Sequence, residues 1–231
     1  MTEEAAGSVI WMRPERAATG RPARHSREEI TAAAIRIADF EGLDAVSMRR
    51  VAADLGAGAA SLYRHVDDRE DLLDLMIDAT AAEYLFAPPS GDWLADLLGI
   101  GEQARMIMRR HHWLPSLVIT RSVLGPNGLV LLEHVLEALA DHPASAAAKL
   151  EAFGIFNSAT ALFVHNELTG GSERQQRTAA YLRYALVTGR HPRLAELLSP
   201  AAAPLEEAPD PQDRYRDILA GILTGLLAPG R

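Results

Sequence analysis

The chain of 231 residues contains no cysteine. It can therefore form neither a disulfide framework nor a thiolate metal site, and it has no cysteine nucleophile. It also lacks any apolar run of the roughly 18–20 residues that a membrane-spanning helix requires. The arginine-rich start has no apolar stretch behind it, so no secretory signal is expected. These absences predict a soluble cytoplasmic protein without a membrane partner.

Two further kinds of pattern are missing from the sequence. No segment alternates apolar and polar residues with period two, so strands are not expected and the predicted fold class is all-α. No nucleophile–base constellation and no glycine-rich phosphate loop stand out, so neither an enzyme nor a cofactor is expected. The adjacent His111 and His112 point about 100° apart on a helix, which disfavours a shared metal ion. No metal site is predicted.

Charge is distributed unevenly along a chain whose net charge is −8. Residues 1–66 hold nine arginines and nine acidic residues, whereas 67–231 hold 14 basic and 22 acidic residues. Within 13–27, five arginines stand against one glutamate. Such asymmetry suits a nucleic-acid-binding unit joined to a part that stays off nucleic acid. Charge scatter of this size is also common, so the asymmetry alone leaves both interpretations open.

Three regions can be separated by composition and periodicity. Residues 1–25 mix Gly, Pro, Ala and Arg without periodicity, which predicts a flexible basic arm. Residues 26–67 carry the signals of three short helices. Residues 68–231 carry longer helical patterns and are expected to form a larger C-terminal domain. The expected helices of that domain start at Asp67 or Asp68 and run to about Phe86, then cover about 92–110, 115–122, 127–141, 144–168, 172–189, 192–198 and 212–228.

The region 26–67 has the pattern of a helix-turn-helix unit. Ser26 and Glu29 form a capping box at the start of the first helix, and Ser47 caps the second. Gly56 ends the second helix by adopting a left-handed conformation. A third helix is expected over about 58–65, with Leu62 and Val66 buried. Two short helices separated by a glycine turn are the shape that lays a helix in the major groove of DNA.

Specific residues in this region resemble the tetracycline-repressor (TetR) family. They are Val51-Ala52-x-x-Leu55-Gly56, Leu62-Tyr63-x-His65-Val66 and then Leu72-Leu73. The resemblance continues more weakly through Trp93, Gly125-Pro126-Asn127 and Leu132-Glu133 into a tetracycline-repressor-like C-terminal domain. It implies a homodimeric transcriptional regulator that binds a near-palindromic operator in double-stranded DNA. It also implies a ligand-binding C-terminal domain and a repressor that leaves its operator when a small ligand binds.

The candidate DNA contacts lie on the outer side of the third helix and around the second. Arg64 can bind guanine with two hydrogen bonds, Ala59 and Ala60 can meet thymine methyl groups, and Tyr63 and His65 have the reach for phosphates. The resemblance assigns base reading to Arg49. The expected set is Ser47, Arg49, Arg50, Ala59, Ala60, Ser61, Tyr63, Arg64, His65 and Arg69.

Each DNA candidate has a plainer alternative. The arginines can be solvated surface residues, and His65 can be a packed linker residue. The stretch Arg21-Pro22-Ala23-Arg24 offers a second contact, because the negative potential of the minor groove favours arginine. The alternative for that stretch is a disordered, solubilising tail.

The ligand pocket is expected to differ from that of the tetracycline repressor. An ungapped alignment places the polar drug-binding and magnesium-binding positions at Leu85, Ile100, Val118 and Val135, all apolar here. A largely apolar ligand of a different kind is therefore expected. The predicted pocket set is Leu85, Ile100, Ala104, Met106, Trp113, Val118, Arg121, Val135, Asn157 and His165. Ordinary core or surface packing is the alternative for each residue.

The homodimer is expected to form through the helices at about 144–168 and 212–228. The last helix has a wide apolar stripe, and Gly221 and Gly225 allow another backbone to approach closely. Packing of both helices inside the monomer is the alternative. Two rival functions also stay open at this point. One is a helical small-molecule-binding protein or enzyme with an incidental helix-turn-helix, and the other is a DNA-binding dimer without a ligand.

Overall fold

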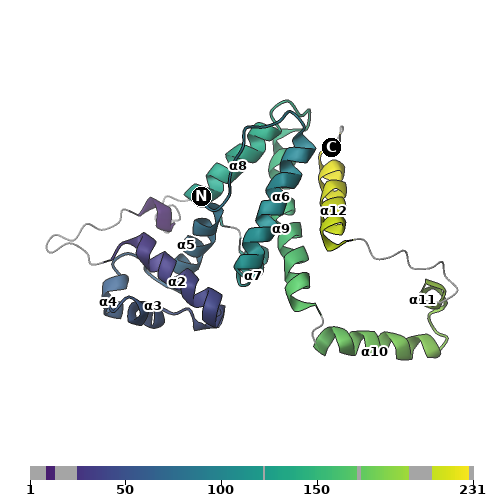
Figure 1. The fold of residues 1–231 in the computed structure, drawn as a ribbon, viewed down its shortest axis with the longest axis horizontal. Helices are drawn as coiled ribbons and strands as arrows, with labels where there is room; N and C mark the ends of the chain where they lie inside the picture. The colour runs from purple at the N-terminus through teal and green to yellow at the C-terminus, as the bar shows by residue number, and fades with distance from the viewer. Residues whose placement is uncertain (1–8, 14–24, 122, 171–172, 198–209, 229–231) are drawn as a thin grey trace, which may run out of the picture.

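The computed structural model describes residues 9–13, 25–121, 123–170, 173–197 and 210–228. Throughout these ranges the regular structure is helical and contains no strand, which confirms the all-α prediction (Figure 1). The elements are η1 (Ile10–Met12), α2 (Arg27–Glu41), η2 (Leu43–Ala45), α3 (Met48–Asp54), α4 (Ala59–Leu62), α5 (Arg69–Ala81), α6 (Trp93–Arg110), α7 (Leu114–Thr120), α8 (Pro126–Ala138), α9 (Ala146–Thr169), α10 (Glu173–Val187), α11 (Pro192–Leu197) and α12 (Pro211–Leu226).

Local signals set the first helices of the chain, which we call the head (residues 26–67). The Ser26 Oγ accepts from the Glu29 N–H at 3.1 Å, and the Glu29 carboxylate accepts from the Ser26 N–H at 2.9 Å. This is the predicted capping box. Ser47 caps α3. Gly56 has a φ of +60°, which glycine adopts without the steric cost of a Cβ. The chain can therefore turn from α3 into α4 within a few residues.

Two helices are shorter than the sequence pattern predicts. The third was expected to reach His65, but α4 ends at Leu62, whose carbonyl accepts from both the His65 N–H (2.9 Å) and the Val66 N–H (3.0 Å). Such shared bonds are common at helix ends. The fourth was expected to reach Phe86, but α5 ends at Ala81. Gln103 of α6 binds both backbone groups of Leu85, at 2.7 and 3.1 Å, and so draws this segment along α6.

The start of the chain was predicted to be a flexible arm, and the segment 9–13 is instead packed. Ile10 is only 2% exposed and belongs to the same core as the head. Arg13 pairs with Asp67 and Asp71 at the entry to α5. Trp11 covers Gly125, where an added Cβ would lie 2.6 Å from the indole. An apolar side chain and two ion pairs thus hold a segment whose composition indicated only mobility.

Two hydrophobic cores organise the described residues. The first contains the head, α5 and the buried side chains of Ile107, Trp113 and Val164. It therefore continues past the predicted boundary between residues 67 and 68. The second lies among α6, α8, α9 and α12, around Phe156. Helix α5 connects the head to the rest of the molecule and contributes to the first core along most of its length.

The C-terminal helices form a bundle in which α6, α9 and α12 lie side by side (Figure 1). Gly101 makes this close approach possible, because a Cβ there would lie 2.5 Å from Leu219. The Tyr215 hydroxyl joins all three helices through the Gly101 carbonyl (2.8 Å) and the Thr160 hydroxyl (3.0 Å). Helices α10 and α11 extend away from the bundle. Among the described helices, none combines the length and the apolar character needed to span a bilayer.

Candidate functional site

The outer face formed by α3, α4 and the turn after α4 carries two arginines whose side chains have no partner among the described residues. Arg49 and Arg64 are both exposed. Neither guanidinium makes a hydrogen bond or an ion pair with another residue in the described part of the chain. Ala60, Ser61 and Tyr63 are exposed beside Arg64, while Ala59 is half-buried. The face therefore offers small side chains and uncommitted positive charge. That these residues contact DNA stays a prediction.

Ser47 and Arg50 have structural roles at the start of α3. The Ser47 Oγ accepts from the Arg50 N–H at 3.2 Å and so caps α3. The Arg50 guanidinium lies 2.5 Å from the Glu41 carboxylate and 3.8 Å from that of Asp54. The hydrogen bond to Glu41 raises the pKa of Arg50. Arg50 remains partly exposed, so a phosphate contact would have to compete with these two carboxylates.

Two other candidates do not belong to this face. His65, in the turn after α4, is only 7% exposed. Its carbonyl accepts from the Arg27 guanidinium at 3.1 Å. Arg69 donates to the carbonyls of Val46 (2.9 Å) and Leu43 (3.1 Å), so its guanidinium joins α5 to the segment before α3. The positions of His65 and Arg69 therefore do not support the DNA contacts predicted for them. The stretch 21–24 lies outside the described residues.

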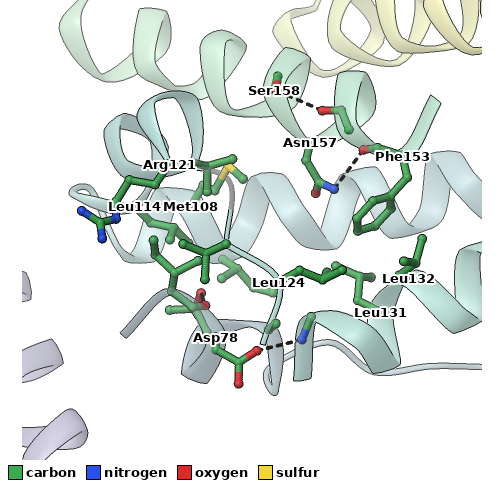
Figure 2. Close-up of a pocket in the computed structure, with 18 of the residues that line it drawn as sticks. Asp78, Met108, Leu114, Arg121, Leu124, Leu131, Leu132, Phe153, Asn157 and Ser158 are labelled. Carbon is green, nitrogen blue, oxygen red and sulfur yellow. Dashed lines mark hydrogen bonds between the residues drawn. The ribbon is translucent and has the colours of Figure 1, made fainter. Parts of the chain in front are cut away.

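A pocket of about 650 Å³ opens among α5, α6, α7, α8 and α9 (Figure 2). Most of its wall is apolar. Met108 and Leu114 stand on one side, Leu131 and Phe153 on another, and the carboxyl group of Asp78 lies below them in the view. The remaining lining residues are Ile77, Thr80, Ala81, Tyr84, Ile107, Val118, Ile119, Thr120, Arg121, Val123, Leu124, Gly128, Leu132, Leu150, Gly154, Asn157 and Ser158.

Three of the ten predicted pocket residues line this pocket, namely Val118, Arg121 and Asn157. The other seven lie elsewhere. Leu85 and Met106 are exposed at 81% and 60%. His165 is exposed as well, on α9. The remaining four are packed in the interior: Ile100, Ala104, Trp113 and Val135.

Three of the misplaced residues lie close in sequence to residues that do line the pocket. Met108, two positions after Met106, lines the pocket, and so does Leu131, one turn before Val135. Leu114 is a lining residue, whereas its neighbour Trp113 donates its indole N–H to Asp39 at 2.7 Å. Adjacent helix positions point about 100° apart, so a small alignment slip replaces a wall residue with a core or surface residue.

The polar side chains of the pocket wall are largely committed to the protein. The Asp78 carboxylate, 6% exposed, accepts from the Gly128 N–H (2.9 Å) and from the Asn127 N–H and side-chain amide at the start of α8. Arg121 pairs with Glu70 and Asp74. Asn157 donates to the Phe153 carbonyl at 3.0 Å. Such a wall offers few free donors and no uncommitted charge.

Sequence-family models match both parts of the chain. A model described as "Bacterial regulatory proteins, tetR family" matches residues 30–76, and one described as "Tetracyclin repressor-like, C-terminal domain" matches residues 86–229. The chain is 36% identical over 140 residues to an HTH-type transcriptional regulator of Saccharopolyspora erythraea, covering 60% of this chain and 59% of the relative. It is 38% identical over 130 residues to the HTH-type transcriptional repressor DrrR1 of Streptomyces coeruleorubidus, covering 55% and 48%. The matched part thus spans about half the length of these curated relatives.

Solved structures agree with these matches. Apo ActR from Streptomyces coelicolor is similar with a TM-score of 0.76 at 29% identity, covering 90% of this chain and 100% of that one. ActR in complex with actinorhodin is similar with a TM-score of 0.72 at 30% identity, covering 89% and 97%. The C-terminal model by itself matches more than half of the sequence. The chain therefore belongs to the tetR family of bacterial regulatory proteins.

Proposed function

We propose that this protein is a sequence-specific DNA-binding transcriptional regulator that contacts its operator through α3 and α4. The observation that carries the proposal is the pair of exposed arginines, Arg49 and Arg64, which have no partner in the described part of the chain. Arg50 and Arg69 of the same unit are held by the protein itself. Positive charge left free on a helix-turn-helix suits contact with base edges and phosphates.

The regulator acts as a homodimer through α9 and α12. Ile155 and Leu162 of α9 and Ile218 of α12 are exposed although apolar. An added Cβ at Gly221 would meet nothing within 4 Å, which leaves room for a partner's backbone. Pairing these faces by two-fold symmetry would bury them. It would also present two α4 helices to a near-palindromic operator.

The pocket makes the regulator a ligand-responsive repressor. The relative DrrR1 is named a repressor, and ActR has been solved with actinorhodin bound. The volume of about 650 Å³ and the apolar wall suit a largely apolar small molecule, because the polar side chains Asp78, Arg121 and Asn157 already have protein partners. A ligand shifts the protein from its operator only if it binds the DNA-free arrangement more tightly.

Arg64→Ala tests the DNA contact. On an operator selected from random duplexes, this variant should bind roughly ten-fold more weakly or worse, because a bidentate base contact is worth about 1–3 kcal/mol. Its affinity for random DNA should change little. Arg193→Ala removes a comparably exposed arginine on α11, far from α4, and should bind like the wild type. Equal losses of Arg64→Ala on operator and random DNA would contradict base reading.

The same assay tests the response to ligand. Compounds that raise the melting temperature of the protein are selected from an apolar library that includes actinorhodin. Adding them to the complex with labelled operator should release the DNA. Compounds that stabilise the protein and leave the operator bound would favour a DNA-binding dimer without a ligand response.

A further inference from the structure

A buried histidine bridges two carboxylates that come from different parts of the fold. His111 is 4% exposed and lies at the corner between α6 and α7. Its Nδ1 is 2.8 Å from the Asp39 Oδ1, and its Nε2 is 2.8 Å from the Glu83 Oε1. Asp39 belongs to the last turn of α2 in the head, and Glu83 follows the end of α5. The imidazole thus connects the head, the end of the connecting helix and the C-terminal bundle.

Each of the two carboxylates is held by a second donor from the same corner. The Trp113 indole N–H donates to the Asp39 Oδ1 at 2.7 Å. The Arg110 guanidinium pairs with the Glu83 Oε2. A carboxylate oxygen only accepts hydrogen bonds, so a ring nitrogen that carries a hydrogen donates to the acid that it faces. Arg110, His111 and Trp113 therefore present a row of donors to two acids.

The corner that carries His111 also borders the ligand pocket. Met108 precedes it by one helical turn, Leu114 follows it in α7, and both line the pocket. The His111 carbonyl accepts from the Leu114 N–H at 2.8 Å, which fixes the direction in which α7 begins. The pocket wall and the donors that hold the head are therefore parts of one short segment.

We propose that His111 is a positioning residue that clamps the head in one orientation on the C-terminal bundle. Apolar contacts in the shared core are non-directional, whereas two short polar contacts at opposite sides of one ring favour a single geometry. In a dimer, the clamp fixes the separation of the two α4 helices. This consequence rests on the dimeric DNA-binding function proposed above, whereas the clamp itself lies within one chain.

Spin labels can measure the orientation of the head directly, because the chain contains no cysteine. Cysteines replace two exposed residues, Ala53 on α3 and Glu133 on α8. The doubly labelled chain is mixed with an excess of unlabelled chain, so that only distances within one chain are recorded. We expect one narrow distance distribution for the clamped protein.

His111→Gln should broaden or shift that distribution while the far-UV circular dichroism stays helical. Asp39→Asn, which removes one acceptor charge and keeps the shape, should have the same effect in smaller measure. His112→Gln changes the neighbouring exposed histidine and should leave the distribution unchanged. A narrow, unshifted distribution in a folded His111→Gln protein would overturn the clamp, even if its melting temperature falls.

The consequence for DNA is measured separately. His111→Gln should lower the preference for the selected operator over one with lengthened half-site spacing by roughly five-fold or more. A protein that never binds an operator would sink the proposed function and leave the spin-label result to decide the clamp. A broadened distribution with unchanged spacing preference would show that the clamp holds the head but does not set the separation of the two heads.

Discussion

The outer face of the head and the wall of the pocket treat their polar side chains in opposite ways. On the head, Arg49 and Arg64 are exposed and have no partner among the described residues. In the pocket, Asp78, Arg121 and Asn157 are all bound to the protein itself. The first surface leaves its strongest donors available to a partner, whereas in the second these three side chains are already bound within the protein.

This difference indicates which partner each surface suits. An unpaired guanidinium group that is exposed to water carries little free-energy penalty. It forms its strongest hydrogen bonds with phosphates and base edges. A polar group in an apolar wall lowers the stability of the fold if it has no hydrogen bond. Asp78, Arg121 and Asn157 each have such a partner within the protein. The head therefore suits a charged and extended partner. The pocket suits one that is recognised mainly by its shape and apolar surface.

Asp78→Ala should give the largest effect. The change removes a buried acceptor shared by three donors at the start of α8, so those N–H groups lose their partner inside the protein. The free energy of unfolding should fall by about 3 kcal/mol or more. Urea denaturation followed by circular dichroism measures it.

Asp141→Ala is the matched control, since that carboxylate is exposed beyond the end of α8. It should change the free energy of unfolding by no more than about 0.5 kcal/mol. If Asp78→Ala kept its stability and lost only ligand affinity, the carboxylate would be a free ligand-binding group. The pocket would then hold a free polar group, as the outer face of the head does, and the difference between the two surfaces would be wrong.

Arg69→Met and Arg49→Met compare a committed arginine with a free one. Arg69 holds the carbonyls of Val46 and Leu43, so its loss should lower the free energy of unfolding by about 1–3 kcal/mol. Arg49→Met should stay within about 0.5 kcal/mol of the wild type and lose operator affinity instead. Thermal unfolding and DNA titration of both variants separate the two roles. If Arg49→Met lost stability and Arg69→Met lost only operator affinity, Arg49 would be the structural residue and Arg69 the DNA contact.

Much of the head could be predicted because its signals are local. The capping box of Ser26 and Glu29, the Ser47 cap and the Gly56 turn each involve residues a few positions apart. The outward direction of Arg64 follows from the inward direction of Leu62, two residues earlier. His65 was misjudged because the turn after α4 depends on the neighbouring segments, among them Arg27 of α2.

The pocket could be predicted only in outline, because its wall is assembled from five helices that each contribute a few residues. A register error of one or two positions in any of them changes which side chain faces inward, as Met106 and Met108 illustrate. The apolar character was expected from the family alignment, although only Val118 of its four positions lines the pocket. Asp78 was missed because its partners at the start of α8 lie about 50 positions away. The packing of Ile10 and Trp11 similarly depends on helices distant in sequence.

The smallest expected effect is the difference in stability between two tyrosine-to-phenylalanine variants. Burial raises the pKa of both tyrosines, Tyr84 and Tyr215. The Tyr215 hydroxyl binds the Gly101 carbonyl and Thr160, so Tyr215→Phe should lower the free energy of unfolding by about 1–2 kcal/mol. Tyr84 lines the pocket, and its hydroxyl makes no hydrogen bond within the described residues. Tyr84→Phe should therefore leave the free energy of unfolding at neutral pH unchanged or slightly higher.

The stability of the same two variants should also differ at alkaline pH. Burial raises the pKa of Tyr215 to about 12, and burial also raises that of Tyr84, whereas an unfolded tyrosine ionises near pH 10. Both residues thus contribute stability that is fully present below about pH 10 and is lost as the pH rises toward the folded-state values. Tyr84→Phe should remove part of that alkaline loss at no cost at neutral pH, as urea titrations between about pH 8 and 11 can measure. A Tyr84→Phe protein that is less stable at neutral pH by about 1 kcal/mol would mean that the hydroxyl is committed to the fold. The pocket would then hold no uncommitted phenol to offer a ligand.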